Sequence, residues 1–519
     1  MEIIQNKALL VSADRHEQIT SKIERSKLVR TENGDTKVAV YWGLKEAQQL
    51  TSMNLGKVPS TIERDYQWTG RYSPFEHQRE TSGFLTLNKR AFCFNEQGTG
   101  KTASVIWAAD YLLRQKAIKR VLVICPLSIM KSAWQQDLFT FAMHRSCSIA
   151  YGSAAQRKRI LADGAEFVII NFDGIGVIEE EIVRGGFDLI VVDEANAYKN
   201  PKTNRWKLLN RILLKTDPYL WMLTGTPAAQ SPVDAYGLAK MVNPEGCPKY
   251  LNAFRDKVMF QVTRFKWIPK PDAQETVHSI LQPAIRFEKK DCLDLPPVTY
   301  LDRESPLTPQ QKRYYDDLAS QMLIEAAGEE ISAVNAAAKI NKLLQISGGA
   351  AYTDTGEVVE FDVSHRLKAV LEVIEEAANK VLVFVPFTHT IELLKDYLTK
   401  NKISCEVING KVHPNKRASI VEEFQSKDTP RVLLIQPQAA SHGLTLTAAD
   451  TIVWYAPVTS VETYLQANAR IDRPGQKHKM TVVHIRGSDV EARLYKLLRG
   501  NINNHEKLID LYREMMKAS

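Results

Sequence analysis

Residues 95–102, NEQGTGKT, combine the residue types of a phosphate-binding loop. The backbone N–H groups of a glycine loop and of the helix after it bind phosphate oxygens. We expect Lys101 to contact the β- and γ-phosphates of ATP and the Thr102 hydroxyl to bind Mg²⁺. The usual pattern has a further glycine where Asn95 stands, so a plain strand-to-helix turn remains an alternative. The residues that would surround the phosphates are Gly98, Thr99, Gly100, Lys101 and Thr102.

Two adjacent carboxylates follow an apolar run in residues 187–200, FDLIVVDEANAYKN. Asp193 can hold the magnesium ion, and Glu194 can activate the attacking water as a general base. Acidic pairs usually lie on solvated faces, so this pair alone is a weak signal. Its place at the end of a predicted buried strand, downstream of Lys101, favours a role in catalysis.

A third strand end carries small and hydroxylated residues, in residues 221–232, WMLTGTPAAQSP. Taken alone, this segment is a turn at the end of a strand. Beside the two preceding motifs, we interpret it as a relay between the nucleotide and a second ligand. The relay residues are Thr224, Gly225 and Thr226.

Two arginines occur in residues 466–476, QANARIDRPGQ. Arg470 and Arg473 are three positions apart, so a helix would place them on one face. Guanidinium groups that converge on a transferring γ-phosphate stabilise its charge. An ordinary solvated basic face is the alternative interpretation.

Short apolar, β-branched runs alternate with helical patterns and predict α/β layers. The runs form two groups, over roughly 90–225 and 380–485, separated by a polar segment and a helical stretch at 308–346. Residues 36–44 could form a strand of a small accessory module. The runs are 121–125, 167–171, 189–192, 219–223, 381–385, 432–435, 451–455 and 481–485.

The bulk properties are those of a folded, intracellular protein. The chain has 519 residues, 44% hydrophobic and 25% charged, with no apolar membrane span and no secretion signal. Its six cysteines are scattered without a CxxC pair, which disfavours a disulfide framework or a zinc site. The net charge of +8 permits a polyanionic partner without demanding one.

Taken together, the motifs resemble the helicase-like ATPases of superfamily two, and among them the Swi/Snf-type DNA translocases. Members often carry Asp where Asn95 stands, so the missing glycine is usual for this group. The connector motifs are the more diagnostic part of the resemblance. The matching segments are 76–78 (EHQ), 95–102, 121–134, 285–297 with its Leu-Pro-Pro, 307–315, 343–350, 441–455 and 466–476.

The resemblance implies an α/β fold with two RecA-like parallel-sheet lobes, a helical connector and a small N-terminal region. The expected parts are an N-terminal accessory region (1–65), the first lobe (66–290), the connector with a helical protrusion (291–350), the second lobe (351–490) and a C-terminal helix (491–519). It also implies ATP with Mg²⁺ as cofactors, duplex or branched DNA as partner, no membrane, and a compact monomer. Gln78 would recognise adenine and Gln466 would also contact ATP. The residues implied to couple ATP to DNA are Trp134, Thr224, Gly225, Thr226 and Gly443.

Two positions depart from the family pattern. Asn196 stands where the family usually has His, which affects the link between the second and third motifs rather than hydrolysis itself. His442 occupies a position often held by glycine. Three alternative functions stay open: a strand-separating helicase, the motor subunit of a nuclease complex, and a non-catalytic scaffold that binds nucleotide.

Overall fold

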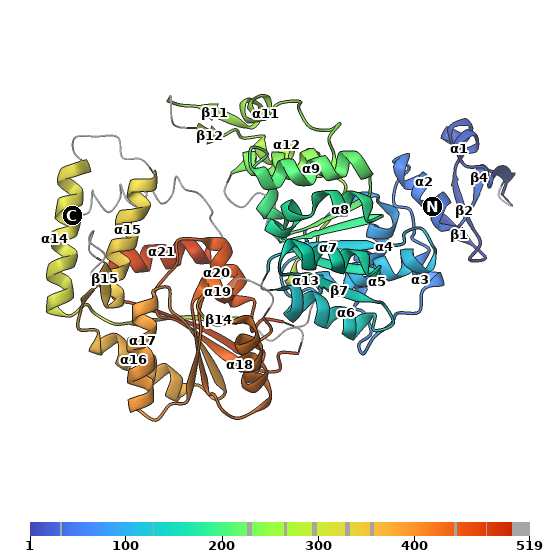
Figure 1. Cartoon of the computed structure of the whole chain (residues 1–519). Helices are drawn as coiled ribbons and strands as arrows, with labels where there is room; N and C mark the ends of the chain where they lie inside the picture. Colours follow the sequence, from blue (N-terminus) through green and yellow to red (C-terminus); the bar gives the residue numbers. More distant parts are fainter. Residues whose placement is uncertain are drawn as a thin grey trace. The chain divides into compact units, whose positions relative to one another are not determined.

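The chain forms two compact units, the first ending at Cys292 and the second beginning at Leu293, apart from the short stretch 229–231 (Figure 1). They are seen in a computed structural model. Each unit is built on its own parallel sheet. The structure describes residues 1–31, 34–127, 129–225, 231–263, 267–292, 298–326, 333–352, 358–440, 444–473 and 475–500.

The first unit contains a seven-stranded sheet in the order β13-β5-β10-β9-β6-β8-β7, and every pairing in it is parallel. Side chains alternate between two buried clusters, one on each face, which is why the strands are apolar throughout. The strands are β5 (Arg90–Cys93), β6 (Val121–Cys125), β7 (Cys147–Ala150), β8 (Phe167–Asn171), β9 (Leu189–Asp193), β10 (Tyr219–Leu223) and β13 (Ala284–Ile285).

Helices cover both faces of this sheet. Side chains of α5 and α6 join one core cluster, and side chains of α7 to α10 and α12 join the other. A small hairpin, β11 (Met259–Gln261) with β12 (Trp267–Pro269), follows α11 (Figure 1). The helices are α4 (Glu76–Leu87), α5 (Lys101–Arg114), α6 (Gln136–Phe141), α7 (Ala154–Ala162), α8 (Glu179–Arg184), α9 (Asn204–Thr216), α10 (Ala235–Val242), α11 (Leu251–Val258), α12 (Ala273–Ile280) and α13 (Lys289–Cys292).

The N-terminal region is a small antiparallel sheet with a core of its own. The strand expected within residues 36–44 is present as β4, while the other three strands were not predicted. Leu9, Val38, Val40 and Leu50 are fully buried in this core. The elements are β1 (Glu2–Ile4), β2 (Ala8–Ser12), β3 (Ser26–Arg30), β4 (Thr36–Tyr41), α1 (His16–Lys22), α2 (Leu44–Ser52) and α3 (Ile62–Asp65), with strand order β1-β2-β4-β3.

The second unit contains a six-stranded parallel sheet in the order β14-β21-β20-β17-β19-β18. The predicted fold class, α/β with two parallel-sheet lobes, is therefore confirmed. The strands are β14 (Val298–Glu304), β17 (Lys380–Phe384), β18 (Cys405–Ile408), β19 (Val432–Ile435), β20 (Ala449–Trp454) and β21 (Met480–Arg486). The helices are α16 (Ser364–Glu376), α17 (Thr388–Lys400), α18 (Pro414–Ser426), α19 (Pro437–Ala440), α20 (Val461–Asn468) and α21 (Asp489–Arg499).

The helical stretch expected at 308–346 forms two helices, α14 (Pro309–Ala326) and α15 (Ala333–Gly348), followed by the hairpin β15 (Ala350–Tyr352) and β16 (Val358–Glu360). The buried amide of Gln311 ties the first helix to the end of the second, donating to the carbonyls of Ile346 at 2.8 Å and Ser347 at 3.1 Å. This contact joins two of the recognised segments, 307–315 and 343–350.

Some expectations fall outside the described residues. These are the Leu-Pro-Pro at 295–297 and the predicted C-terminal helix beyond Gly500. The five-part division of the chain stays a prediction.

Candidate active site

Three neighbouring strands of the first sheet end at the same level and carry the predicted motifs. Leu223 of β10 is in register with Cys93 of β5 on one side and with Asp193 of β9 on the other. Because the strands are parallel, their carboxyl ends meet at one edge of the sheet, where α/β proteins bind ligands. The loop 95–100, Thr224 and Asp193 are thus brought together.

The glycine loop has the conformation that its sequence predicts. Gly98 and Gly100 have φ values of 83° and 81°, which disfavour residues with a side chain. A Cβ at Gly100 would lie 2.1 Å from Gln78 Nε2, so a side chain there would displace the Gln78 amide. Gln78 and His77 both bond through their side chains to the carbonyl oxygen of Thr99, at 3.1 Å and 2.8 Å. Two side chains of helix α4 therefore hold the glycine loop at Thr99.

Lys101 lies at the start of α5, where the helix N-terminus favours anions. Its ammonium donates to the carbonyl oxygens of Asn95 at 2.8 Å and Glu96 at 3.1 Å. Thr102 follows in the first turn and is half-buried. Both residues thus open α5 directly after the glycine loop, and their roles toward nucleotide stay predictions.

The position that departs from the usual glycine pattern is a buried structural residue. Asn95 is 1% exposed. Its amide donates to Thr81 Oγ1 at 2.8 Å and accepts from the backbone N–H of Phe287 at 3.0 Å. Asn95 therefore joins the loop to α4 and to the segment after β13, a role that the loop pattern alone did not predict.

Asp193 has a polar partner deep in the unit. The indole N–H of Trp134, which is fully buried, donates to Asp193 Oδ2 at 2.9 Å. Trp134 lies in a π-helical turn, Met130–Gln135, a form often found at functional sites. Burial raises the pKa of the Asp193 carboxyl, while Trp134, the charge of Lys101 and the N–H of Glu194 oppose the rise.

Glu194 has a backbone conformation that is uncommon for a residue with a side chain. Its φ is 51° and its N–H donates to Asp193 Oδ1 at 2.9 Å. Non-glycine residues in this region concentrate at functional sites. Asn196, which replaces the usual His, lies in the following 3₁₀ turn (Ala195–Tyr198), where its carbonyl accepts from Lys199 N–H at 3.2 Å.

The end of β10 lies against the loop. Thr224 is 1% exposed and its N–H donates to the carbonyl of Cys93 at 3.1 Å. A Cβ at Gly225 would be in ordinary contact with Gln97 at 3.6 Å. Both residues thus lie beside the glycine loop, and the relay role predicted for them stays a prediction. Thr226 lies outside the described residues.

The second-unit arginines are not arranged as the spacing suggested. Helix α20 ends at Asn468, so the expectation that a helix places Arg470 and Arg473 on one face is wrong. Residues 469–471 form a turn and residues 472–473 a bend, and the proline after Arg473 disfavours the helical region for Arg473 itself. Arg470 is 2% exposed and donates to the carbonyl of Leu444 at 3.2 Å.

Arg473 is more accessible than Arg470. It donates to Ala469 O at 2.9 Å and to Thr445 Oγ1 at 3.2 Å. Gln466, expected to contact ATP, is 4% exposed and its amide donates to Glu462 at 3.3 Å. The parts that these residues play in hydrolysis stay predictions. Gly443 and His442 lie outside the described residues.

Two contacts of this site were not foreseen. His77, inside the EHQ segment, bonds to the loop as Gln78 does. Asn95, which stands where the usual pattern has glycine, bonds through its buried amide to Thr81 and Phe287. The resemblance of the EHQ segment to a family motif singled out Gln78, but nothing in the sequence shows that His77 also reaches Thr99 O.

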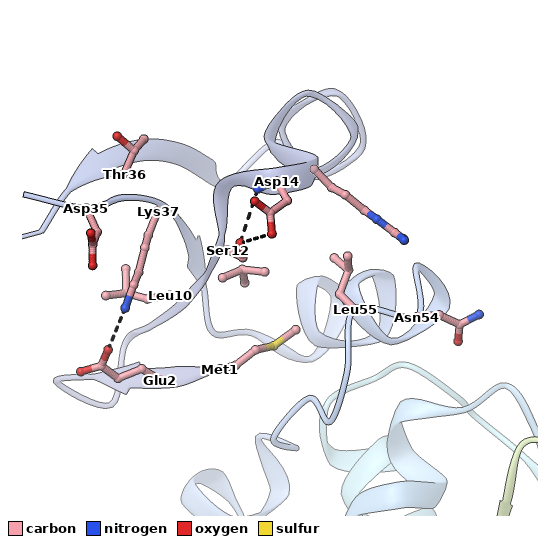
Figure 2. A pocket seen from close by; sticks show the side chains of 12 residues that line it. Met1, Glu2, Leu10, Ser12, Asp14, Asp35, Thr36, Lys37, Asn54 and Leu55 are labelled. Carbon is pink, nitrogen blue, oxygen red and sulfur yellow. Dashed lines mark hydrogen bonds and ion pairs between the residues drawn. The ribbon is translucent and has the colours of Figure 1, made fainter.

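A separate hollow of about 900 Å³ lies on the N-terminal sheet (Figure 2). Two pairs of its polar side chains bond to each other, Lys37 with Glu2 at 3.5 Å and Ser12 with Asp14 at 2.7 Å. None of the expected nucleotide-binding residues lines it. The candidate active site is therefore at the ends of β5, β10 and β9, where the residues expected to bind phosphate and magnesium lie next to one another.

Over the described parts of the chain, no group of three or more His, Cys, Asp or Glu residues could hold a metal ion by itself. A magnesium site here would combine Asp193 and Thr102 with oxygens of the nucleotide, which is how Mg²⁺ usually binds. Across the same residues, no helix combines the length and apolar character that a bilayer crossing requires.

Comparison with known proteins places both units in recognised families. Residues 37–349 match the SNF2-related domain, and residues 365–475 match the helicase conserved C-terminal domain. Mouse chromodomain-helicase-DNA-binding protein 1-like is 27% identical over 425 residues, covering 78% of this chain and 46% of the relative. An uncharacterized ATP-dependent helicase of Mycoplasma genitalium is 25% identical over 398 residues, covering 75% of this chain and 37% of the relative.

The chain thus spans less than half the length of these two relatives. Among solved structures, the SWI2/SNF2 ATPase core of Sulfolobus solfataricus in complex with dsDNA is 20% identical, with a TM-score of 0.40. That alignment covers 83% of this chain and 92% of the other.

Proposed function

Because the chain belongs to the SNF2-related family of helicase-like ATPases, we propose that it hydrolyses ATP at the end of the first sheet and uses the energy to move along duplex DNA. The convergence of Lys101, Thr224 and Asp193 on three adjacent strand ends carries the first half of this proposal. Family membership and the printed names of relatives support the second half.

In the proposed reaction the loop residues divide the work. Lys101 exchanges its two backbone carbonyl partners for the β- and γ-phosphates, which are stronger acceptors of a charged donor. Thr102 and Asp193 hold the magnesium ion, and Glu194 orients the attacking water. Gly98, Thr99 and Gly100 surround the phosphates, while Gln78 and Gln466 contact the nucleotide.

Arg473 supplies positive charge to the transition state from the second unit, because it is the more accessible of the two arginines. Arg470 supports the segment from which Arg473 acts, through its bond to Leu444 O. Binding ATP more tightly when the two units close would drive a conformational cycle.

DNA is the proposed track. Basic side chains that contact the DNA phosphates gain affinity by neutralising charge, whatever the base sequence. The net charge of +8 is compatible with such binding. Trp134 couples this binding to hydrolysis through its bond to Asp193, and Thr224, Gly225, Thr226 and Gly443 complete the coupling. The protein acts inside cells as a monomer.

A non-catalytic scaffold fits the site less well. A scaffold needs neither a general base nor a metal carboxylate, and both Glu194 and Asp193 are present at the strand end. A strand-separating helicase shares these motor residues and is distinguished by its products. A nuclease-complex motor would in addition need a partner that cuts DNA.

The ATPase rate in parallel reactions tests the proposal. The reactions contain no nucleic acid, single-stranded DNA, duplex DNA, forked DNA or RNA, each at low and high salt. We expect the highest rate with duplex DNA and a steep loss of DNA binding as salt rises. Glu194→Gln, which keeps the side-chain shape, is the inactive control. A rate that no nucleic acid changes would contradict the proposed DNA dependence.

A further inference from the structure

The hydrogen bonds that pair β5 with β13 continue beyond both strands into the predicted phosphate loop. Phe92 N–H donates to the carbonyl of Pro283 at 3.0 Å, and Phe94 N–H to that of Ile285 at 2.8 Å. Beyond the strand, Glu96 N–H donates to the carbonyl of Phe287 at 3.0 Å. The ladder of parallel bonds therefore runs on from the sheet into the loop.

Side chains of the loop hold the same segment from the other side. Asn95 Oδ1 accepts from Phe287 N–H at 3.0 Å, so both backbone groups of Phe287 are bound to the loop. Glu96 Oε2 accepts from Lys289 N–H at 3.0 Å. Lys289 begins α13, and α13 ends at Cys292, the last residue of the first unit.

A second contact supports this connection. The ring of Phe287 lies 5.8 Å from the imidazole of His77, centroid to centroid. That imidazole bonds to the carbonyl of Thr99 at 2.8 Å. Phe287 is thus connected to both ends of the glycine loop, at Asn95 and through His77 at Thr99.

The residues that hold this segment also hold the phosphate-binding lysine. The ammonium of Lys101 donates to the carbonyls of Asn95 and Glu96, and both side chains bind backbone N–H groups of residues 287–289. A phosphate that draws Lys101 away removes a positive charge from both carbonyls at once. The backbone carbonyls of Asn95 and Glu96 then lose their bonds to Lys101, in the same two residues whose side chains bind Phe287 and Lys289.

We propose that Asn95 and Glu96 are positioning residues that transmit nucleotide occupancy of the loop to the chain segment leading into the second unit. This inference rests on the proposed binding of ATP at Lys101. It gives the residue in place of the usual glycine a role that a glycine could not have, because glycine has no side chain to bind Phe287.

The two amides bound by these side chains provide a direct measurement. Hydrogen exchange of Phe287 and Lys289 is followed by NMR or by mass spectrometry with fragmentation to single residues, in the full chain with and without a non-hydrolysable ATP analogue. We expect the analogue to change the exchange rate of both amides in the wild type. Lys101→Ala, compared at analogue concentrations that saturate the variant, should lack that response, because the loop lysine is what the phosphate displaces.

Substitutions distinguish the side-chain hydrogen bonds of Asn95 and Glu96 from a role of these side chains in packing alone. Asn95→Ala should speed exchange of the Phe287 amide about tenfold, as expected for one lost hydrogen bond, and abolish its response to the analogue. Asn95→Asp should retain the response, because a carboxylate still accepts from Phe287 and the Thr81 hydroxyl can turn to donate to it. Glu96→Gln against Glu96→Ala forms the matched pair for Lys289.

The amount of DNA movement for each ATP hydrolysed is the second readout. Asn95→Ala and Glu96→Ala should lower it at least several-fold while the affinity for the analogue changes less, whereas Asn95→Asp and Glu96→Gln should restore it. Wild-type protein that binds the analogue without any change at Phe287 and Lys289 would overturn the inference alone. Wild-type protein that fails to bind the analogue would overturn the proposed function, and the inference with it.

Discussion

Trp134 and Asp193 are joined by a hydrogen bond of 2.9 Å between the indole N–H and Oδ2, at the point where β9 ends. A donor to the ionised form of a carboxylate favours that form, so Trp134 acts against the rise in the pKa of Asp193 that burial causes. A tryptophan assigned to coupling from the sequence therefore touches the predicted magnesium ligand itself.

Trp134→Phe should shift the acid limb of the pH profile of kcat/KM for ATP hydrolysis to higher pH, because Asp193 loses a donor to its charged form and its pKa rises further. Asp193 must be ionised to hold Mg²⁺, so activity falls with Asp193 protonation. Trp221→Phe is the control, because its indole donates to the carbonyl of Asn88 at 3.1 Å and not to Asp193. An unchanged acid limb in Trp134→Phe would show that this bond does not tune the site.

Glu194→Gln and Lys101→Ala should fail at different steps. Glu194→Gln keeps Asp193 and the loop, so ATP should bind normally while turnover collapses. Lys101→Ala removes the cation that meets the phosphates, so binding and turnover should both fall. Lys207→Ala, on the exposed face of α9, is the control for loss of a positive charge. Equilibrium binding of a fluorescent ATP analogue and phosphate release distinguish the two, and normal hydrolysis by Glu194→Gln would place the base elsewhere.

The strands that line the site could be predicted because each one is apolar over most of its length, which can be seen in a short stretch of sequence. The runs at 121–125, 167–171 and 219–223 coincide with β6, β8 and β10, since strands buried on both faces must be apolar throughout. β14 was not predicted, because four of its seven residues, VTYLDRE, are polar or charged and the strand lies at the edge of its sheet. Edge strands need fewer buried side chains, so their sequence gives a weaker signal.

The parts of the site that depend on contacts distant in sequence could not be foreseen. The bond between Asn95 and Phe287 spans 192 positions, and no periodicity predicts it. The spacing of Arg470 and Arg473 suggested one face of a helix, but α20 ends at Asn468, before both residues. Local patterns therefore predicted the strands that are buried on both faces, while tertiary contacts determined how each functional side chain is held.

Arg470→Ala and Arg473→Ala should separate stability from turnover. Arg470 is buried and bonds Leu444 O, so its loss should lower the free energy of unfolding of the second unit by about 2 kcal/mol or more. Arg473→Ala should change stability less and lower turnover about a thousandfold, as for other arginine fingers. Urea unfolding and ATPase rates measured on both variants test this division, and equal effects in the two variants would contradict it.

His484 should make the second unit less stable in mild acid. It is fully buried, and burial beside Arg499 lowers its pKa from 6.5 to about 3, although Asp302 opposes the shift. Nδ1 lies 2.6 Å from an Arg499 nitrogen and Nε2 lies 2.9 Å from the Tyr464 hydroxyl, an arrangement that suits neutral imidazole.

The sign follows from proton binding. Below pH 6.5 the unfolded chain takes up a proton at His484 that the folded unit binds only near pH 3, so stability is full above pH 6.5 and falls as the pH drops. The loss between pH 7 and pH 5 should be about 2 kcal/mol for this one group. Hydrogen exchange of β21 amides at both pH values measures it. The loss should be smaller in His484→Gln and unchanged in His365→Gln, whose histidine is exposed. Equal losses in wild type and His484→Gln would contradict the assignment.

The central claim is that ATP hydrolysis at Lys101 drives movement along duplex DNA without obligatory strand separation. The most direct measurement compares displacement of a third strand paired in the major groove with unwinding of a plain tailed duplex, under identical conditions with ATP. We expect rapid displacement that requires ATP and is lost in Glu194→Gln, with the underlying duplex left intact. Fast unwinding of the tailed duplex, together with an ATPase stimulated mainly by single-stranded DNA, would contradict the account and assign the protein to strand-separating helicases.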